Sequence, residues 1–429
     1  MIESPPLTIK TSEIYSYLND PNIIKEIKKI NEKYLYWDKV KYQKIESLNP
    51  EQIWNILKLY RSFNYKEVIF NATSFKYYLT DYIQKSLHEF DLHIGGFMGT
   101  KSLIPDSDKT RYLVSSLMEE AISSSIMEGA NTTRKKAKEM LRKETHPKSK
   151  GEHMIVNNYL TIKHILKHTP EDITPESILQ IHQLMTKNTL DDSADEGKFR
   201  QIDDIYVINT STGEIVHFPP PYIDIPTYIQ DLCNFFNNDG GDFIHPIIKG
   251  MIIHFMIGWI HPFTDGNGRT ARAIFYWYLL KKGYWLMEYL SISRIISDSK
   301  NQYEKAYLYT ENDSLDLSYF ITYHTEVMHR AFEALKKYIQ EKQKENLQIA
   351  NFLRLPNINE RQAQILKTLY DEPEVVFSVK EIQNIFQISN FSARSDLTGL
   401  VNLGYMIAIP VNKVQTNYAR SSKFIDMIK

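Results

Sequence analysis

One short segment of the sequence concentrates the residue types that phosphate chemistry needs. It runs from His261 to Arg272 and reads HPFTDGNGRTAR, so a base, a carboxylate, two glycines, an amide and two arginines fall within twelve residues. The apolar stretches on either side, Met251–Ile260 and Arg269–Lys282, have the character and spacing of helices, and Gly283 is a typical C-cap. The pattern therefore predicts two helices joined by a polar turn.

The turn has the features of an anion-binding site. Gly266 and Gly268 permit backbone conformations closed to other residues, so successive N–H groups can point at one anion where the second helix begins. Arg269 and Arg272 project from one side of that helix's first turn and offer forked donors to phosphate oxygens. Two cations are unfavourable at the positive end of a helix dipole, which indicates that a negative group binds between them.

Asp265 and His261 add a metal ligand and a base to this site. Asp265 offers a hard oxygen beside the predicted phosphate position, which suits Mg²⁺ bound through one carboxylate and phosphate oxygens. His261 follows the first helix, and the ordinary pKa of a histidine lies near enough to neutrality for it to accept a proton from an attacking hydroxyl. The segment thus supplies a base, a metal ligand, a phosphate cradle and an arginine clamp.

The same glycines also fit a dinucleotide-binding pattern. Residues 266–271 match G-x-G-x-x-A, and Glu288 lies where a ribose-binding acid is expected. That pattern requires a strand that runs directly into the first glycine, whereas the polar residues 261–265 intervene here. No G-x-x-x-x-G-K-[ST] sequence occurs, which excludes a Walker-type loop. We therefore disfavour both of these nucleotide-binding folds.

A second histidine raises the question of a metal pair. His254 precedes His261 by seven residues and would share its helix face. It lies in an apolar run, however, which is more typical of a hydrogen-bonded core histidine than of a metal ligand. Phe263 is interpreted in the same way, as a core residue that anchors the turn.

The twelve residues match the signature H-P-F-x-[DE]-G-N-G-R-x-x-R without a departure, and the chain resembles the Fic family. The resemblance extends from about Leu103 to about Leu335 and includes the segments GKFR at 197–200 and HFPPP at 217–221. It implies a mostly helical core that uses ATP and Mg²⁺ to transfer AMP to a Ser, Thr or Tyr hydroxyl of a target protein. The resemblance assigns these roles: His261 as general base, Asp265 as Mg²⁺ ligand, Gly266, Asn267 and Gly268 as α- and β-phosphate cradle, Arg269 as a further phosphate contact, and Arg272 as γ-phosphate ligand.

One position departs from several members of that family. Tyr276 stands where they carry an asparagine, seven residues after the first arginine of the signature. Recognition of the adenine base is therefore open. Other nucleotides and phosphocholine-like donors, which some relatives use, remain alternatives.

Alternating apolar and polar residues predict a β-hairpin from Ile205 to Val216, with its turn at Ser211, Thr212 and Gly213. By resemblance, this hairpin is a flap that holds the target segment as an added strand beside His261. The alternative is an ordinary surface hairpin. We favour the flap because a transferase that acts on proteins must position a flexible substrate.

A second motif predicts an inhibitory contact. Residues 108–127 have helical spacing, and Ser124-Ser125-Ile126-Met127-Glu128-Gly129 matches the motif [ST]-x-x-x-E-[GN] found in one class of the resembled family. There the glutamate pairs with the second arginine of the signature, here Arg272, and excludes the γ-phosphate. Ser124, Glu128 and Gly129 are thus regulatory candidates. The same glutamate could instead orient water for removal of AMP, so the direction of the reaction stays open.

Composition places the chain among globular proteins of two or three domains. The formal charge of −1 gives no bulk electrostatic reason for nucleic-acid or membrane binding, and no apolar run is long enough for a bilayer. Cys233, the single cysteine, cannot form an internal disulfide, and residues 1–5 do not resemble a signal peptide. We therefore expect a cytoplasmic protein. A homodimer is common among similar proteins and stays open.

We expect a mainly α fold with three parts. Residues 1–100 form a mostly helical N-terminal region, residues 101–345 the helical Fic core with its inhibitory helix and hairpin flap, and residues 350–429 a C-terminal winged helix-turn-helix domain. The last prediction rests on three helices at 360–370, 378–386 and 389–403 followed by a strand pair. A long Lys- and Glu-rich helix from Ser314 to Ile349 is expected to connect the parts.

The winged helix suggests an alternative function, a DNA-binding transcriptional regulator whose Fic core senses a nucleotide. Residues 356–429 contain eight Lys and Arg against seven Asp and Glu, and Asp396 offsets Arg394 on the third helix. DNA binding through 356–429 is therefore weakly supported, and contact with protein is at least as well supported.

Overall fold

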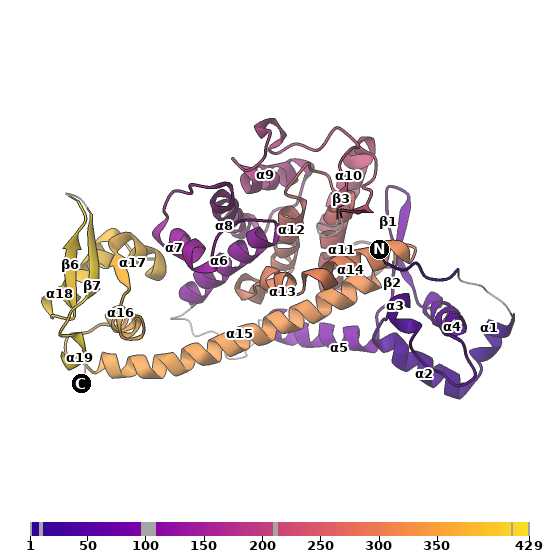
Figure 1. The fold of residues 1–429 in the computed structure, drawn as a ribbon, viewed down its shortest axis with the longest axis horizontal. Coiled ribbons are helices and arrows are strands. Elements are labelled where there is room, and N and C mark those ends of the chain that lie inside the picture. Colours follow the sequence, from indigo (N-terminus) through magenta and orange to yellow (C-terminus); the bar gives the residue numbers. More distant parts are fainter. Residues whose placement is uncertain (1, 8–11, 96–108, 209–212, 413–414, 428–429) are drawn as a thin grey trace.

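The computed structural model describes residues 2–7, 12–95, 109–208, 213–412 and 415–427. Most of these residues are helical, and the strands that are present form three small antiparallel sheets (Figure 1). The predicted mainly α fold is confirmed. The predicted helix start at Asp108, the N-terminal limit of the resemblance at Leu103 and the hairpin residues Ser211 and Thr212 lie outside the described residues.

The N-terminal region is a small helical unit with its own buried cluster. Aromatic side chains pack inward there, with Tyr36, Trp37 and Trp54 nearly inaccessible to solvent. Arg61 lies fully buried among tyrosines and donates to Asn31 Oδ1 and Tyr319 Oη, which ties the unit to the central bundle. The helices are α1 (Ser12–Tyr17), α2 (Pro21–Glu32), α3 (Trp37–Val40) and α4 (Pro50–Ser62).

The next elements belong to the central core by packing. The hairpin of β1 (Lys66–Phe70) and β2 (Thr73–Tyr77), helix α5 (Asp81–Phe90) and η1 (Asp91–Gly95) place buried side chains in the same cluster as the central helices. These elements therefore pack with the central core although they precede the proposed domain boundary at residue 100. The division into three domains remains our proposal.

Two central helices hold the signature segment between them. Helix α11 (Pro246–Ile260) begins at a proline, which is favourable at the first position of a helix, and is apolar on all sides, as expected for a helix surrounded by others. Helix α12 (Asn267–Lys281) packs along it, and both are almost fully buried. The surrounding helices are α6 (Lys109–Met127), α7 (Arg134–Lys143), α8 (Lys150–His168), α9 (Pro175–Thr186), α10 (Ile225–Asn237), α13 (Ile292–Asp298) and α14 (Lys300–Asn312).

Short elements close the central bundle. The predicted hairpin is present as β3 (Val207–Ile208) and β4 (Ile215–His217), which pair antiparallel with a register shift. Gly213 has a φ of 71°, a backbone conformation that suits the predicted turn. The 3₁₀ turns are η3 (Ser193–Asp195), η4 (Tyr222–Asp224) and η5 (Trp285–Tyr289).

Helix α15 (Ser318–Leu353) runs from the central bundle to the C-terminal unit, as Figure 1 shows in orange. That unit has its own buried cluster and a three-stranded sheet in the order β5-β7-β6. The three predicted helices and the strand pair are present, and β5 is an additional strand. The winged-helix assignment and DNA binding stay predictions. The elements are α16 (Glu360–Asp371), β5 (Val376–Ser378), α17 (Val379–Phe386), α18 (Asn390–Asn402), β6 (Met406–Pro410), β7 (Thr416–Arg420) and α19 (Phe424–Met427).

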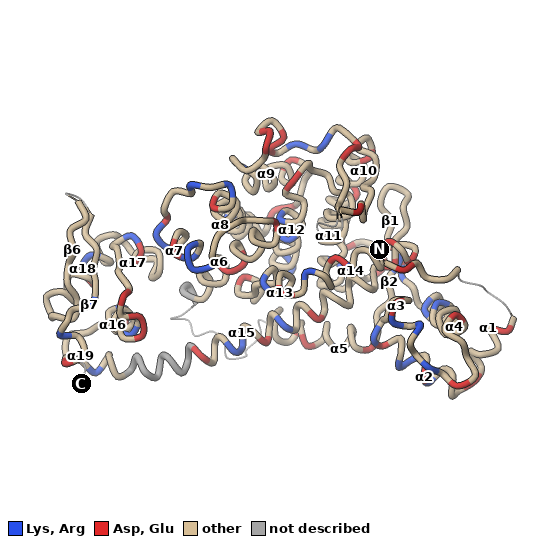
Figure 2. The backbone as a smooth tube through the Cα atoms, viewed as in Figure 1, with Lys and Arg blue, Asp and Glu red and all other residues tan. Residues whose placement is uncertain are grey.

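Charges are distributed without a dominant sign. Figure 2 shows basic and acidic residues interspersed over the helices, with a group of Lys and Arg at α7. Several of the α7 cations have acidic partners, including Glu119, Glu152 and Glu381. Within the ranges that the structure describes, every helix is too short or too polar to cross a membrane.

Three buried histidines of the central core are held in the neutral form. Burial lowers the pKa of His182 to about 4 and that of His324 to about 3, and it lowers the pKa of His254 well below its ordinary value. Between these values and about pH 6.5 the unfolded chain binds protons that the folded chain does not. We therefore expect the free energy of unfolding to fall as pH decreases, by up to about 1.4 kcal/mol per pH unit for each histidine.

Urea unfolding at about pH 7.5, 6.5 and 5.5 would measure this slope above the range in which most carboxylates titrate. His324→Phe keeps the ring shape and removes one titrating group, so its slope should be smaller by about one proton. The exposed His146→Gln is the matched control and should leave the slope unchanged. Equal slopes for wild type and His324→Phe would contradict the neutral state of His324.

Candidate functional site

The signature segment forms the predicted turn between two helices. Helix α11 ends at Ile260, His261 adopts the left-handed conformation with φ 48° and ψ 57°, and α12 starts at Asn267. Left-handed backbone is uncommon for a histidine, so the surrounding contacts must hold it. Phe263 is fully buried in the turn and stacks on His182 with ring centroids 3.7 Å apart, so the prediction of a core anchor is confirmed.

Side chains from outside the segment bind its carbonyl groups. The Arg200 Nε donates to the His261 carbonyl at 2.9 Å, and the Arg200 backbone N–H donates to the Pro262 carbonyl at 2.9 Å. His182 accepts from the Gly197 N–H at Nδ1, so its Nε2 carries the proton and donates to the Asp265 carbonyl at 2.9 Å. These contacts fix the course of the turn from two sides.

The imidazole of His261 is oriented by its own helix. Its Nδ1 lies 3.2 Å from the Gly258 carbonyl and therefore carries the proton, which leaves the lone pair on Nε2. Burial lowers the pKa of His261 to about 4, and the His217 and Arg200 charges act in the same direction. At neutral pH the ring is neutral and able to accept a proton at Nε2.

The two glycines of the turn serve different purposes. Gly266 has a φ of 83°, and a Cβ there would lie 2.8 Å from Thr186 Cγ2, so both conformation and space require glycine. Gly268, in contrast, lies within α12 and has no positive φ, so our prediction that it needs an unusual conformation is wrong. Its constraint is space, because a Cβ would overlap Glu128 Oε1 and lie 3.2 Å from Arg272 Nη1.

Asn267 and Asp265 point in different directions. The Asn267 amide pairs with both backbone groups of Phe263, accepting at 3.0 Å and donating at 2.8 Å. Its side chain thus closes the turn. Asp265 is exposed, and one of its oxygens accepts from the Gly266 N–H, so the carboxylate is open to a metal ion.

The two arginines are buried and have unused donors. Arg269 donates from Nη1 to the Met185 carbonyl at 3.1 Å, and Arg272 donates from Nε to Ser124 Oγ at 2.9 Å. In the part of the chain that the structure describes, nothing accepts from Arg269 Nε and Nη2 or from Arg272 Nη1. Buried charged donors without acceptors are unfavourable, which indicates an anionic ligand between them.

The inhibitory-motif residues contact one of these arginines. Glu128 Oε1 lies 2.9 Å from Arg272 Nη2, and the Ser124 carbonyl accepts from the same nitrogen at 3.1 Å. Burial favours the neutral acid, but the Arg272 guanidinium holds the pKa of Glu128 below its ordinary value. Gly129 follows with a φ of 92° and lets the chain turn away. The Glu128–Arg272 pair that the resemblance implied is therefore present.

Tyr276 and His254 are core residues. The Tyr276 hydroxyl lies 3.0 Å from Glu120 Oε2 and accepts from the Ile292 N–H, inside a buried polar cluster where burial also raises the pKa of Glu120. His254 is fully buried with Nε2 3.1 Å from the Tyr303 hydroxyl. Across the described ranges, no three His, Cys, Asp or Glu side chains gather as a metal site. The burial of His254 and its contact with Tyr303 confirm the interpretation of it as a core residue.

Sequence reasoning missed two residues that shape the site. His182 had no signal beyond its place on the apolar face of α9, and Arg200 was noted only as part of a matching segment. Each lies more than sixty positions before the turn that it binds. A single sequence contains no local pattern that reveals such a contact.

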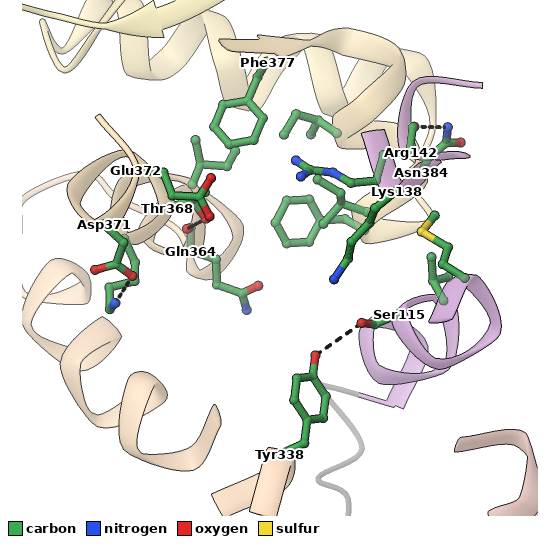
Figure 3. Close-up of a pocket in the computed structure, with 17 residues that line it drawn as sticks. Ser115, Lys138, Arg142, Tyr338, Gln364, Thr368, Asp371, Glu372, Phe377 and Asn384 are labelled. Atoms are coloured by element: carbon green, nitrogen blue, oxygen red, sulfur yellow. Dashed lines mark hydrogen bonds and ion pairs between the residues drawn. The ribbon is translucent and has the colours of Figure 1, made fainter. Parts of the chain in front are cut away.

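A cavity of about 300 Å³ lies elsewhere, between α6, α7 and the C-terminal unit (Figure 3). Lys138 and Arg142 line one side and Gln364, Thr368 and Glu372 the other. Beside the cavity the C-terminal unit contacts α7 directly through these pairs: Arg142–Glu381, Lys380–Glu144 at 2.9 Å, and Asn384 Nδ2 donating to the Arg142 carbonyl at 2.9 Å. None of the residues that line the cavity belongs to the signature segment.

Comparison with known proteins identifies the region around the turn. Residues 172–279 match the Fic/DOC family. Over 113 residues the chain is 31% identical to proteins named protein adenylyltransferase Fic from Drosophila sechellia and Drosophila melanogaster. The match covers 26% of this chain and 21% of each relative, so the chain spans about a fifth of their length.

Solved structures share the fold over a longer range. A Fic family protein from Desulfovibrio desulfuricans aligns with a TM-score of 0.50 at 18% identity and covers 81% of this chain and 98% of that protein. Fic-1 from C. elegans aligns with a TM-score of 0.50 at 16% identity and covers 77% of this chain and 91% of that one. These identities are low, so the likeness concerns the fold.

Proposed function

From the match of residues 172–279 to the Fic/DOC family, we propose that the chain is an autoinhibited protein adenylyltransferase. In the proposed reaction the hydroxyl oxygen of a target Ser, Thr or Tyr bonds to the α-phosphorus of ATP. The bond from that phosphorus to the oxygen bridging to the β-phosphorus breaks, and pyrophosphate leaves. The proton of the hydroxyl passes to His261 Nε2.

The unused donors of Arg269 and Arg272 support this activity most directly. Among the residues that the structure describes, three buried guanidinium nitrogens of Arg269 and Arg272 have no acceptor, and both arginines lie near the start of α12, where the helix dipole is also positive. A triphosphate would satisfy them and place its α-phosphate near the turn. His261 Nε2, which is unprotonated at neutral pH, stands at the other end of the same turn.

The remaining signature residues complete the proposed site. The backbone N–H groups after Gly266 would bind phosphate oxygens once Glu128 leaves the space beside Gly268, since Gly268 has no side chain of its own there. Asp265 would hold Mg²⁺, whose other ligands would be phosphate and water oxygens. The metal would neutralise charge on the leaving pyrophosphate.

The β3–β4 hairpin is the proposed flap for the target segment. Ile208 and Ile215 are about half exposed on it, and neighbouring apolar side chains, including Phe218, also face solvent. An extended target could pair with such a strand and press its side chains on these residues. Its hydroxyl would then lie beside His261.

Transfer of a labelled phosphate tests the proposed activity. Protein incubated with Mg²⁺ and ATP should become labelled when the α-phosphate carries the label and remain unlabelled when the γ-phosphate does, because pyrophosphate leaves. The Glu128→Gly variant is the form of the protein to assay, since the proposed inhibition is absent from it. Label from the γ-phosphate, or none from either position, would contradict AMP transfer.

A further inference from the structure

His217, the last residue of β4, lies where three elements of the site meet. Its side chain is 7% exposed. Its Nε2 lies 2.7 Å from the carbonyl of Trp259 in the last turn of α11, and its Nδ1 lies 2.9 Å from Glu311 Oε2 on α14. One imidazole thus joins the hairpin to the helix that ends at His261 and to a carboxylate from a third element.

Both partners of this ring are hydrogen-bond acceptors. A backbone carbonyl has no proton to donate, and neither has a carboxylate, whereas a neutral imidazole has only one N–H. The two short contacts therefore require a proton on each nitrogen, or a proton on Glu311. Because a carboxyl group is ordinarily the stronger acid of the two, the shared proton belongs on the imidazole. The geometry thus describes an imidazolium paired with a carboxylate.

A positive charge on His217 is favourable where this ring lies. The Trp259 carbonyl belongs to the last turn of α11, where carbonyl groups lack helical N–H partners and the dipole is negative. The neighbouring Gly258 carbonyl is bound by His261 Nδ1. Two adjacent carbonyls therefore orient two histidines, His217 on the proposed flap and His261, the proposed base. His261 interacts electrostatically with this ring, and Arg200 acts in turn on His261 and binds its carbonyl.

We propose that His217, held as an imidazolium by Glu311, is a positioning residue that fixes the hairpin at a set distance from the reacting nitrogen of His261. It touches no reacting atom. Its consequence for activity rests on the proposed function, in which the hairpin aligns the target. Its charge state and its hold on the hairpin can be measured without any activity.

Nitrogen-15 spectra of histidine-labelled full-length protein test the charge state. At about pH 7.5 the His217 signals, assigned through their loss in His217→Gln, should be those of an imidazolium, while His182 and His254 should be neutral. Glu311→Gln offers an amide N–H to Nδ1, so His217 should become neutral in that variant. A neutral His217 in the wild type would overturn the proposal.

Hydrogen exchange tests the hold on the hairpin. Amides of β3 and β4 should exchange roughly tenfold faster or more in His217→Gln and Glu311→Ala, the range expected for loss of one charged hydrogen bond. Glu311→Gln should exchange nearly as slowly as wild type, because its amide can bind the neutral ring. Glu304→Gln, which removes an exposed carboxylate from the same helix, is the control and should change nothing. Unchanged exchange in Glu311→Ala would overturn the positioning role.

The rate of label transfer, measured in the Glu128→Gly background, is a third test. At one fixed pH, Glu311→Ala should label more slowly than its parent, and Glu311→Gln should label at nearly the parent rate. If no protein transfers label, the proposed function fails while the spectra and the exchange rates still decide the role of His217. If label is transferred and Glu311→Ala labels at the parent rate, the positioning role fails alone.

Discussion

Glu128→Gly should transfer AMP about ten- to hundredfold faster than wild type, the range expected when one charged hydrogen bond no longer competes with the nucleotide. Glu128 Oε1 contacts Arg272 Nη2 and occupies the space above Gly268. In the proposed reaction a triphosphate would need the same guanidinium and the same space, so the two would exclude each other. Initial rates of label transfer from α-labelled ATP would measure the effect.

Glu144→Gly is a matched control for this prediction. Glu144 follows α7 as Glu128 follows α6, and its left-handed backbone accepts glycine without strain. It pairs with Lys380 on the surface and lies outside the phosphate-binding turn. Its rate should equal that of wild type. If Glu128→Gly also shows the wild-type rate, the Glu128–Arg272 pair has no inhibitory role.

His261→Ala in the Glu128→Gly background should lower the rate of transfer about 10²- to 10⁴-fold, the usual contribution of a general base. The KM for ATP should change little, because no phosphate contact is assigned to His261. The burial that lowers the pKa of His261 to about 4 also sets the pH dependence. The protonated, inactive form dominates only below that value, so the acid limb of the rate should lie near pH 4 and not near 6.5.

Exposed His146→Ala provides the comparison, and it should keep both the rate and the acid limb. Circular dichroism would verify that each variant is folded at every pH used, since buried histidines destabilise the fold in the same range. A transfer rate in His261→Ala within a few-fold of its parent would exclude His261 as the base.

The sequence alone could predict those parts of the site that are local. His261, Asp265 and Arg272 fall within twelve residues, and helical periodicity on both sides defines the turn that carries them. The C-terminal helices were predictable for the same reason, because caps such as Ser378 and Ser389 and apolar spacing lie within each element. Local patterns encode local structure.

Contacts between distant segments required the structure. His182 reaches the turn from 83 positions away and Arg200 from 61, and neither distance leaves a trace in a single sequence. The Glu128–Arg272 contact spans 144 positions and was expected only through a family resemblance. Packing of β1, β2 and α5 into the central core escaped prediction as well, since three-dimensional burial decides which cluster an apolar side chain joins.

In the proposed function, Gly268 ties regulation to activity in a way that limits how the protein can change. The space beside its Cα holds the Glu128 carboxylate and, in the proposed reaction, would hold the nucleotide instead. A substitution that fills this space would expel the inhibitor and the substrate alike, leaving an enzyme that is neither controlled nor active. Mutations that release activity must therefore arise on the α6 side of the contact, at Ser124, Glu128 or their supports, where the substrate is not bound.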